Sequence, residues 1–164
     1  QSLHQFDLSP RKLCRAIQDE FSIPATTSTL ALSDALKAIG ATKIGLVTPY
    51  LDEIQNKIIS NFKEEGFDCV SELHLRDPGN FSFSEITSEV IENMVREVAL
   101  HDPHAIIIFC TNLRGAPLVA PLEKLLGVSI FDTVSVVVWK SLMLAGVDTR
   151  SIKGWGGLFE GEIG

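Results

Sequence analysis

The sequence predicts an α/β fold in which helices flank a parallel sheet. Segments with the period of an amphipathic helix alternate with short apolar runs, as expected for strands joined by helical crossovers. One run, residues 104–109 (HAIIIF), is almost entirely apolar, which is typical of a central strand covered on both faces. The chain has 164 residues, 45% of them hydrophobic, which suits a single globular domain.

Two helices are expected before any strand. Ser9 suits an N-cap and Pro10 suits the first helical turn, so the first helix is predicted to begin there and to run to Phe21. Residues 26–41 predict a second helix with the stop signal Gly40 near its end.

The remaining elements alternate between strand and helix. Pro49 ends the first predicted strand, and Gly66 closes the helix that follows it. The expected strands cover 42–48, 67–75, 104–109 and 128–131, and the expected helices cover 51–66, 85–101, 116–127 and 133–146. The tail, residues 147–164, carries five glycines and is expected to be irregular.

Composition disfavours some partners. The net charge is −7 and the pI is near 5.0, and no basic run is present, so neither nucleic acid nor an anionic membrane is expected to bind. No apolar run is long enough to span a bilayer, and no signal peptide opens the sequence. The three cysteines are far apart and form no metal-binding spacing, so we expect reduced thiols in the cytoplasm and no metal site.

Cys110 is the strongest candidate for chemistry. It ends the apolar strand and is followed by polar Thr111 and Asn112 and then a helix, a position where backbone N–H groups and the helix dipole favour a thiolate. The same N–H groups would bind a carboxylate or stabilise an enediolate. The alternative is a buried, inert cysteine. Cys14 and Cys69 lie within predicted elements and are interpreted as core residues.

Other cysteine chemistries do not fit the spacing. A phosphate-cleaving C-x5-R loop would need arginine at the position of Ala116, whereas Arg114 is too close to Cys110. A thiol–disulfide site would need a second nearby cysteine, and a G-x-G-x-x-G dinucleotide loop is missing.

Two further residues lie at the ends of predicted strands or turns. Tyr50 ends the first strand, where its hydroxyl could donate to an anionic substrate or its ring could lie over the next helix. Asn80 belongs to a Pro-Gly-Asn turn, in which asparagine is common for backbone reasons alone.

Several segments together resemble the aspartate/glutamate racemase superfamily. The likeness covers about Ile23 to Ala145, and its specific part is "VTPY" followed at the expected distance by "CTN". Within the superfamily the sequence is most similar to the maleate cis–trans isomerase and arylmalonate decarboxylase branch.

The resemblance implies two α/β lobes facing each other across a cleft, and no metal or organic cofactor. It identifies Cys110 with the second-lobe cysteine that acts as proton donor or nucleophile. It identifies Tyr50 and Asn80 as contacts to a substrate carboxylate, and the backbone around Thr111 and Asn112 as part of the carboxylate cradle.

The first-lobe motif of the family has no counterpart in this sequence, and in the family that stretch would precede Gln1. We therefore expect residues 1–41 to be the end of a first lobe and 42–146 to be the α/β lobe that carries Cys110. The predicted activity is cofactor-independent isomerisation, racemisation or decarboxylation at a carbon next to a carboxylate. The expected partner is a small carboxylate, and a homo-oligomer is also considered.

Two other functions stay open from the sequence. One is an amino-acid or hydantoin racemase, although "CTNLR" favours the isomerase and decarboxylase branch. The other is a non-catalytic relative that binds carboxylates or proteins.

Overall fold

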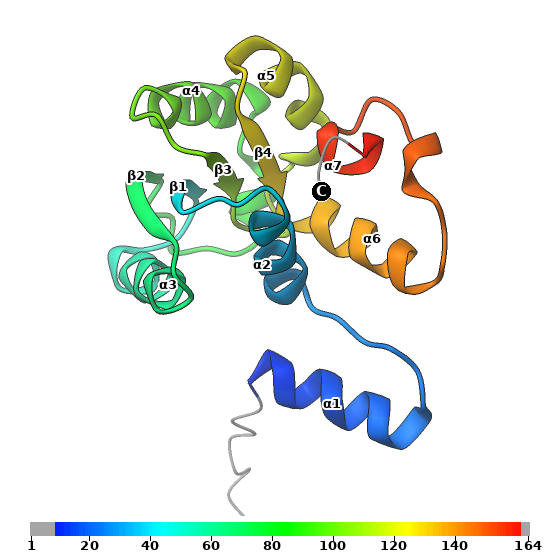
Figure 1. Ribbon diagram of the computed structural model, residues 1–164. Helices are drawn as coiled ribbons and strands as arrows, with labels where there is room; N and C mark the ends of the chain where they lie inside the picture. The colour runs from blue at the N-terminus through cyan, green and yellow to red at the C-terminus, as the bar shows by residue number, and fades with distance from the viewer. Residues whose placement is uncertain (1–8, 162–164) are drawn as a thin grey trace, which may run out of the picture.

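A parallel four-stranded sheet forms the centre of the computed structural model, which describes residues 9–161. The strand order is β2-β1-β3-β4, and every neighbouring pair is parallel, as predicted (Figure 1). The strands are β1 (Lys43–Thr48), β2 (Asp68–His74), β3 (Ala105–Ile108) and β4 (Ser129–Asp132). The α/β fold class expected from the sequence is therefore confirmed.

Helices cover both faces of the sheet, so its central strands are buried except for Lys43 at the start of β1. The helices are α1 (Pro10–Phe21), α2 (Ser28–Ala38), α3 (Asp52–Glu64), α4 (Ser88–Ala99), α5 (Val119–Leu126), α6 (Thr133–Leu144) and α7 (Gly157–Glu160), with short 3-10 turns at Ser82–Glu85, Ala116–Leu118 and Thr149–Ser151. Side chains of α2, α3, α6 and α7 share one apolar cluster with the sheet, and those of α4 and α5 share the other. Figure 1 shows these two helical layers on opposite sides of the strands.

Glycine allows one close contact between the layers. A Cβ atom on Gly45 of β1 would lie 2.3 Å from Cγ1 of Val98 on α4, so only glycine fits at this position without movement of Val98. Helix α4 therefore packs directly against the middle of a central strand.

The tail differs from the prediction. Instead of being irregular, it forms a 3-10 turn and α7, whose Leu158 and Phe159 are buried in the cluster of α2 and α6. Its glycines act at turns, because Gly154, Gly156 and Gly161 have positive φ angles that other residues rarely adopt. The many glycines of this tail therefore indicate sharp turns between short packed elements, not an irregular segment.

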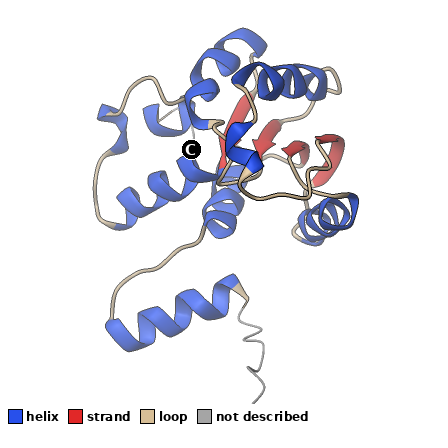
Figure 2. Cartoon of the chain, turned by 180° about the vertical axis from the view of Figure 1, so that it is seen from behind, coloured by secondary structure: helices blue, strands red, loops and turns tan. Residues whose placement is uncertain are grey.

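Helix α1 projects from the body of the molecule and is connected to α2 by an extended segment (Figures 1 and 2), while its first residues line a cavity with residues of α2 and α3. The helix begins as predicted, with Ser9 accepting from the backbone of Lys12, but none of its residues is buried. Core placement of Cys14 was therefore wrong, whereas the half-buried Cys69 packs against the cluster of α2 and α6. The apolar periodicity of α1 thus predicted the helix correctly, but no other element of the described residues buries its apolar face.

Candidate active site

The candidate residues gather at the carboxyl edge of the sheet, where its strand order reverses. Strands β1 and β3 are adjacent although β2 lies between them in sequence, so their crossovers run in opposite directions from this point. Ligands of open α/β sheets bind outside the strand ends at such a switch point. Val47 pairs with Ile108, which brings the residues just beyond both strands, Tyr50 and Cys110, to the same level.

Cys110 is buried beneath the loops at this edge. Its side chain is only 5% exposed and packs within the cluster of α4 and α5. The backbone N–H of Asn112 donates to Sγ of Cys110 at 3.4 Å. The turn after β3 therefore places a backbone hydrogen-bond donor directly on the sulfur.

Tyr50 is directed toward the thiol and not over the next helix. Its hydroxyl hydrogen bonds with Cys110, and its ring meets Phe83 edge to face, with the centroids 5.7 Å apart. Burial of the phenol, the hydrogen bond to Cys110 and the charge of the thiolate, in that order, raise the pKa of Tyr50. Tyr50 therefore keeps its proton at neutral pH and can donate it in a hydrogen bond.

The loop after β2 carries Asn80 to the same edge. Its first part is fixed by Asp77, whose backbone N–H donates to O of Pro49 and whose carboxylate accepts from Gly79 and from the hydroxyl of Ser82. The backbone O of Asn80 then accepts from Nδ2 of Asn112 at 2.6 Å.

The structure thus connects four of the five site residues expected from the sequence. Tyr50 contacts Cys110, Cys110 contacts Asn112, and Asn112 contacts Asn80. Thr111, the fifth, is exposed in the turn between Cys110 and Asn112. Their roles toward a substrate remain predictions.

Sequence reasoning missed the polar residues beneath this edge. Thr48 and Gln55 are both buried, and the Thr48 hydroxyl donates to Oε1 of Gln55 at 2.6 Å. The signal in the sequence was a threonine at the end of an apolar strand, followed by a glutamine on the next helix. The charged residues of that helix made the glutamine look like one more exposed polar residue.

Asp132 was also missed. It caps α6, where Oδ1 accepts from the backbone N–H groups of Val134 and Ser135, and burial raises the pKa of its carboxyl group. Its Oδ2 atom has no hydrogen-bond partner and lies where a Cβ atom on Gly115 would approach to 2.9 Å. Asp132 therefore lies directly against Gly115, in the loop that follows Cys110.

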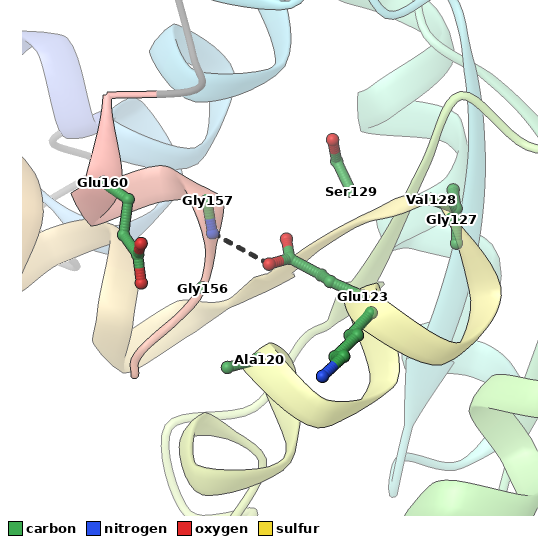
Figure 3. A pocket seen from close by; sticks show the side chains of 9 residues that line it. Ala120, Glu123, Gly127, Val128, Ser129, Gly156, Gly157 and Glu160 are labelled. Atoms are coloured by element: carbon green, nitrogen blue, oxygen red, sulfur yellow. Dashed lines mark hydrogen bonds between the residues drawn. The ribbon is translucent and has the colours of Figure 1, made fainter. Parts of the chain in front are cut away.

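The cavities at the other end of the sheet involve none of the candidate residues. One, of about 550 Å³, lies where β4 begins, between α5 and α7 (Figure 3). There Glu123 accepts from the backbone N–H groups of Ile130 and Gly157, which attaches α7 to the end of the sheet. Within residues 9–161, no cluster of three or more His, Cys, Asp or Glu side chains could hold a metal ion. In the same range no helix combines the length and apolar character that a bilayer crossing requires.

A family profile described as arylmalonate decarboxylase matches residues 5–159, nearly the whole chain. The chain belongs to this family. The arylmalonate decarboxylase of Bordetella bronchiseptica is 24% identical over 88% of this chain and 61% of its own length. A maleate isomerase of Nocardia farcinica is 26% identical over 71% of this chain and 47% of its own length.

Solved structures of arylmalonate decarboxylase and its relatives share the fold. The maleate cis–trans isomerase of Nocardia farcinica bound to TRIS matches 93% of this chain with a TM-score of 0.86 at 21% identity. A variant of that enzyme with a covalently bound succinylcysteine intermediate matches 92% with a TM-score of 0.82 at 22% identity. These two matches cover 64% and 63% of the solved chains, respectively. The present chain thus spans somewhat less than two thirds of the length of these two solved chains.

Proposed function

We propose that the protein carries out cofactor-independent chemistry at a carbon next to a carboxylate, with Cys110 as the reacting group. The observation that supports this most directly is the pair of donors on the sulfur, the Tyr50 hydroxyl and the Asn112 backbone N–H, at the switch point of the sheet. A merely structural buried cysteine would not need two polar groups directed at it.

Two reactions suit this arrangement. In isomerisation, the Cys110 thiolate adds to a C=C bond of a small diacid, and the electron pair moves into the neighbouring carboxylate as an enediolate. Rotation about the resulting single bond and expulsion of the thiolate then give the other geometric isomer. In decarboxylation, CO₂ leaves, and the Cys110 thiol donates its proton to the remaining enediolate carbon.

The relatives support the covalent route more directly. The succinylcysteine in the Nocardia farcinica isomerase variant joins a cysteine to a four-carbon diacid, as thiolate addition requires. We therefore place maleate isomerase-like chemistry first and decarboxylation of an arylmalonate second.

The residues around Cys110 would hold the substrate carboxylate. The Tyr50 hydroxyl and the Asn80 amide would donate hydrogen bonds, and Thr111 and Asn112 would contribute backbone N–H groups from the turn. Donors at these positions stabilise the enediolate more than the starting carboxylate, because negative charge increases there during the reaction.

Replacement of the thiol tests this proposal. Cys110→Ser in the full natural chain should lower turnover of maleate or an arylmalonate about 100- to 10,000-fold, since the hydroxyl is a far weaker nucleophile and acid than the thiol. Cys69→Ser is the matched control, because Cys69 is also partly buried but lies within β2. Full turnover by the Cys110→Ser protein would overturn the assignment.

The two other functions predict different results. A racemase would exchange the α-proton of an amino acid or hydantoin for deuterium in D₂O, whereas an isomerase of small diacids would not. A non-catalytic relative would be stabilised against heat by maleate, with the same shift in the Cys110→Ser protein and no turnover by either.

Three broader expectations are part of the proposal. The free thiols of the described residues support a reducing, cytoplasmic location. Leu13 and Phe21 on α1 are 40% and 66% exposed, which supports self-association into a homo-oligomer, testable by sedimentation velocity. We also propose that residues 1–41 end a first lobe and that residues 42–146 form the lobe with Cys110.

A further inference from the structure

A chain of hydrogen bonds runs behind Tyr50, away from the side that faces Cys110. The Thr48 hydroxyl accepts from the backbone N–H of Tyr50 at 3.4 Å and donates to Oε1 of Gln55 at 2.6 Å. Thr48 is fully buried and Gln55 is 1% exposed. Two polar side chains thus replace apolar packing at the point where β1 passes into the site.

The chain continues through Gln55 to the edge strand β2. Nε2 of Gln55 donates to Oε2 of Glu72 at 2.7 Å. The same oxygen lies 2.7 Å from Nδ1 of His74, while Nε2 of His74 lies 2.6 Å from Oδ1 of Asp52. Both nitrogens of this ring therefore face carboxylate oxygens. Arg76 completes the chain by donating to the same Asp52 oxygen.

These contacts determine which way the Gln55 amide faces. Glu72 can only accept from it, so the NH₂ group points to Glu72 and the carbonyl oxygen to Thr48. The Thr48 hydroxyl then donates its single hydrogen to Gln55, and its oxygen accepts from the backbone N–H of Tyr50. Each hydrogen bond therefore fixes the direction of the next one, from Glu72 on the edge strand through Gln55 and Thr48 to the backbone of Tyr50.

We infer that Gln55 is a positioning residue for Tyr50: anchored by Glu72 and His74, it holds Thr48 so that the backbone of Tyr50 is fixed and its hydroxyl reaches Cys110. This inference rests on the proposed function for its catalytic meaning, but the geometry of Tyr50 can be measured without turnover. A hydroxyl displaced by about 1 Å can cost an enzyme on the order of 100-fold in rate.

The fold itself does not need this amide. The backbone around Thr48 is already supported, because its O accepts from Leu75 and the O of Pro49 accepts from Asp77. The α3 helix begins on its own bonds, with the backbone N–H groups of Ile54 and Gln55 donating to O of Leu51. A leucine at position 55 would fill a similar volume, but it would remove the acceptor of the Thr48 hydroxyl and leave Glu72 with His74 as its hydrogen-bond partner.

The test follows Tyr50 directly, since it is the only tyrosine in the chain. Labelling tyrosine with ¹³C at the ring carbon that bears the hydroxyl gives a single NMR signal that reports on the Tyr50–Cys110 contact. In Gln55→Leu this signal should move toward that of free tyrosine or broaden, and kcat/KM should fall about 10- to 100-fold. In the control Asn56→Leu, an exposed neighbour on α3, neither should change.

A second variant tests the order of the chain. Thr48→Val keeps the shape of threonine but removes the hydroxyl between Gln55 and Tyr50, so it should shift the Tyr50 signal in the same way. The double variant should do little more than either single one, because both break the same path. If Gln55→Leu does not fold, Thr48→Val carries the test alone.

The outcomes separate this inference from the proposed function. An unchanged Tyr50 signal in folded Gln55→Leu or Thr48→Val overturns the positioning role, whatever the activity. A shifted signal in a protein that turns over neither maleate nor an arylmalonate supports the positioning role and contradicts the proposed function. Independent, additive effects of the two substitutions on the signal would also overturn the inference.

Discussion

Tyr50 combines two properties at the scale of the residue, a polar tip at the reacting sulfur and a ring packed against Phe83. The sequence allowed its place at a strand end to be predicted, because Pro49 stops β1 one residue earlier. It left open whether the ring faces the site or the next helix, since that depends on Thr48 and Gln55 meeting in the interior. Cys110 was predictable from the apolar strand before it, whereas the unpartnered oxygen of Asp132 depends on tertiary packing alone.

Tyr50→Phe should weaken carboxylate binding and alter stability at high pH. Loss of one hydrogen bond to a charged group costs about 1.5–3 kcal/mol, which corresponds to roughly 10- to 150-fold in KM. Because the pKa of Tyr50 is raised on folding, the unfolded chain releases this proton first, and stability should fall as pH rises above about 10.

Urea unfolding of both proteins between pH 8 and 11, values chosen to bracket the ordinary tyrosine pKa of about 10, isolates this contribution. Burial also raises the pKa of Cys69, to about 11, and its effect begins at lower pH in both proteins. The difference between the two curves therefore belongs to Tyr50. Equal slopes above pH 10 would show that its proton is not held more tightly in the folded state.

At the scale of the element, apolar periodicity predicted helices better than it predicted their burial. Helix α1 has the pattern of a covered helix and yet buries nothing within residues 9–161, while the glycine-rich tail places α7 in the core. Periodicity shows which face of a helix is apolar, but the partner of that face lies elsewhere in the chain or in another molecule. The prediction of an irregular tail was wrong because its glycines form short turns on either side of two core residues, Leu158 and Phe159.

A matched pair of substitutions measures this difference. Leu158→Ala in α7 should lower the free energy of unfolding by about 2–5 kcal/mol, since the side chain is 3% exposed. Leu13→Ala in α1, where the side chain is 40% exposed, should stay within about 0.5 kcal/mol. Chemical denaturation of both variants provides the comparison. A large loss for Leu13→Ala would indicate that α1 packs against a partner in solution.

The loop after β3 offers a second prediction at this scale. A Cβ atom on Gly115 would lie 2.8 Å from Cγ2 of Ile108 and 2.9 Å from Oδ2 of Asp132, so Gly115→Ala should lift the loop and destabilise the fold by about 1–3 kcal/mol. It should also change the rate at which iodoacetamide alkylates Cys110.

Gly45→Ala serves as the comparison, because it causes a clash with α4 away from the turn that carries Cys110. We expect it to lower stability without altering alkylation of the folded protein, as measured by peptide mass spectrometry. An equal change in both variants would mean that alkylation reports global opening and not the local loop.

At the scale of the whole molecule, the order β2-β1-β3-β4 places the two strands that lead into the site at the centre of the sheet. The alternation of helices and strands predicted the parallel sheet, but it did not predict which strands are neighbours. Strand order follows from how the crossovers pack on each face, for example through the close contact of α4 at Gly45. The site is therefore assembled from loops that are distant in sequence and joined only by the folded sheet.

Hydrogen exchange should reveal this centre. Amides of β1 and β3, each paired on both sides, should exchange last and with the free energy of global unfolding. Amides of α1 should exchange first, because the helix has no buried side chain to protect it. Native-state exchange read by NMR checks both expectations, and protection of α1 equal to that of β1 would contradict this gradient.

The burial of Cys110 also affects the order in which peroxide would oxidise the cysteines of the protein. Oxidation of a thiol to sulfenic acid and beyond requires access of the oxidant to the sulfur. Cys14 is partly exposed on the peripheral helix α1, whereas Cys110 lies beneath Tyr50 and the loop that follows β3. Oxidative damage should therefore collect at Cys14, on a helix without buried residues, before it reaches the reacting sulfur of Cys110.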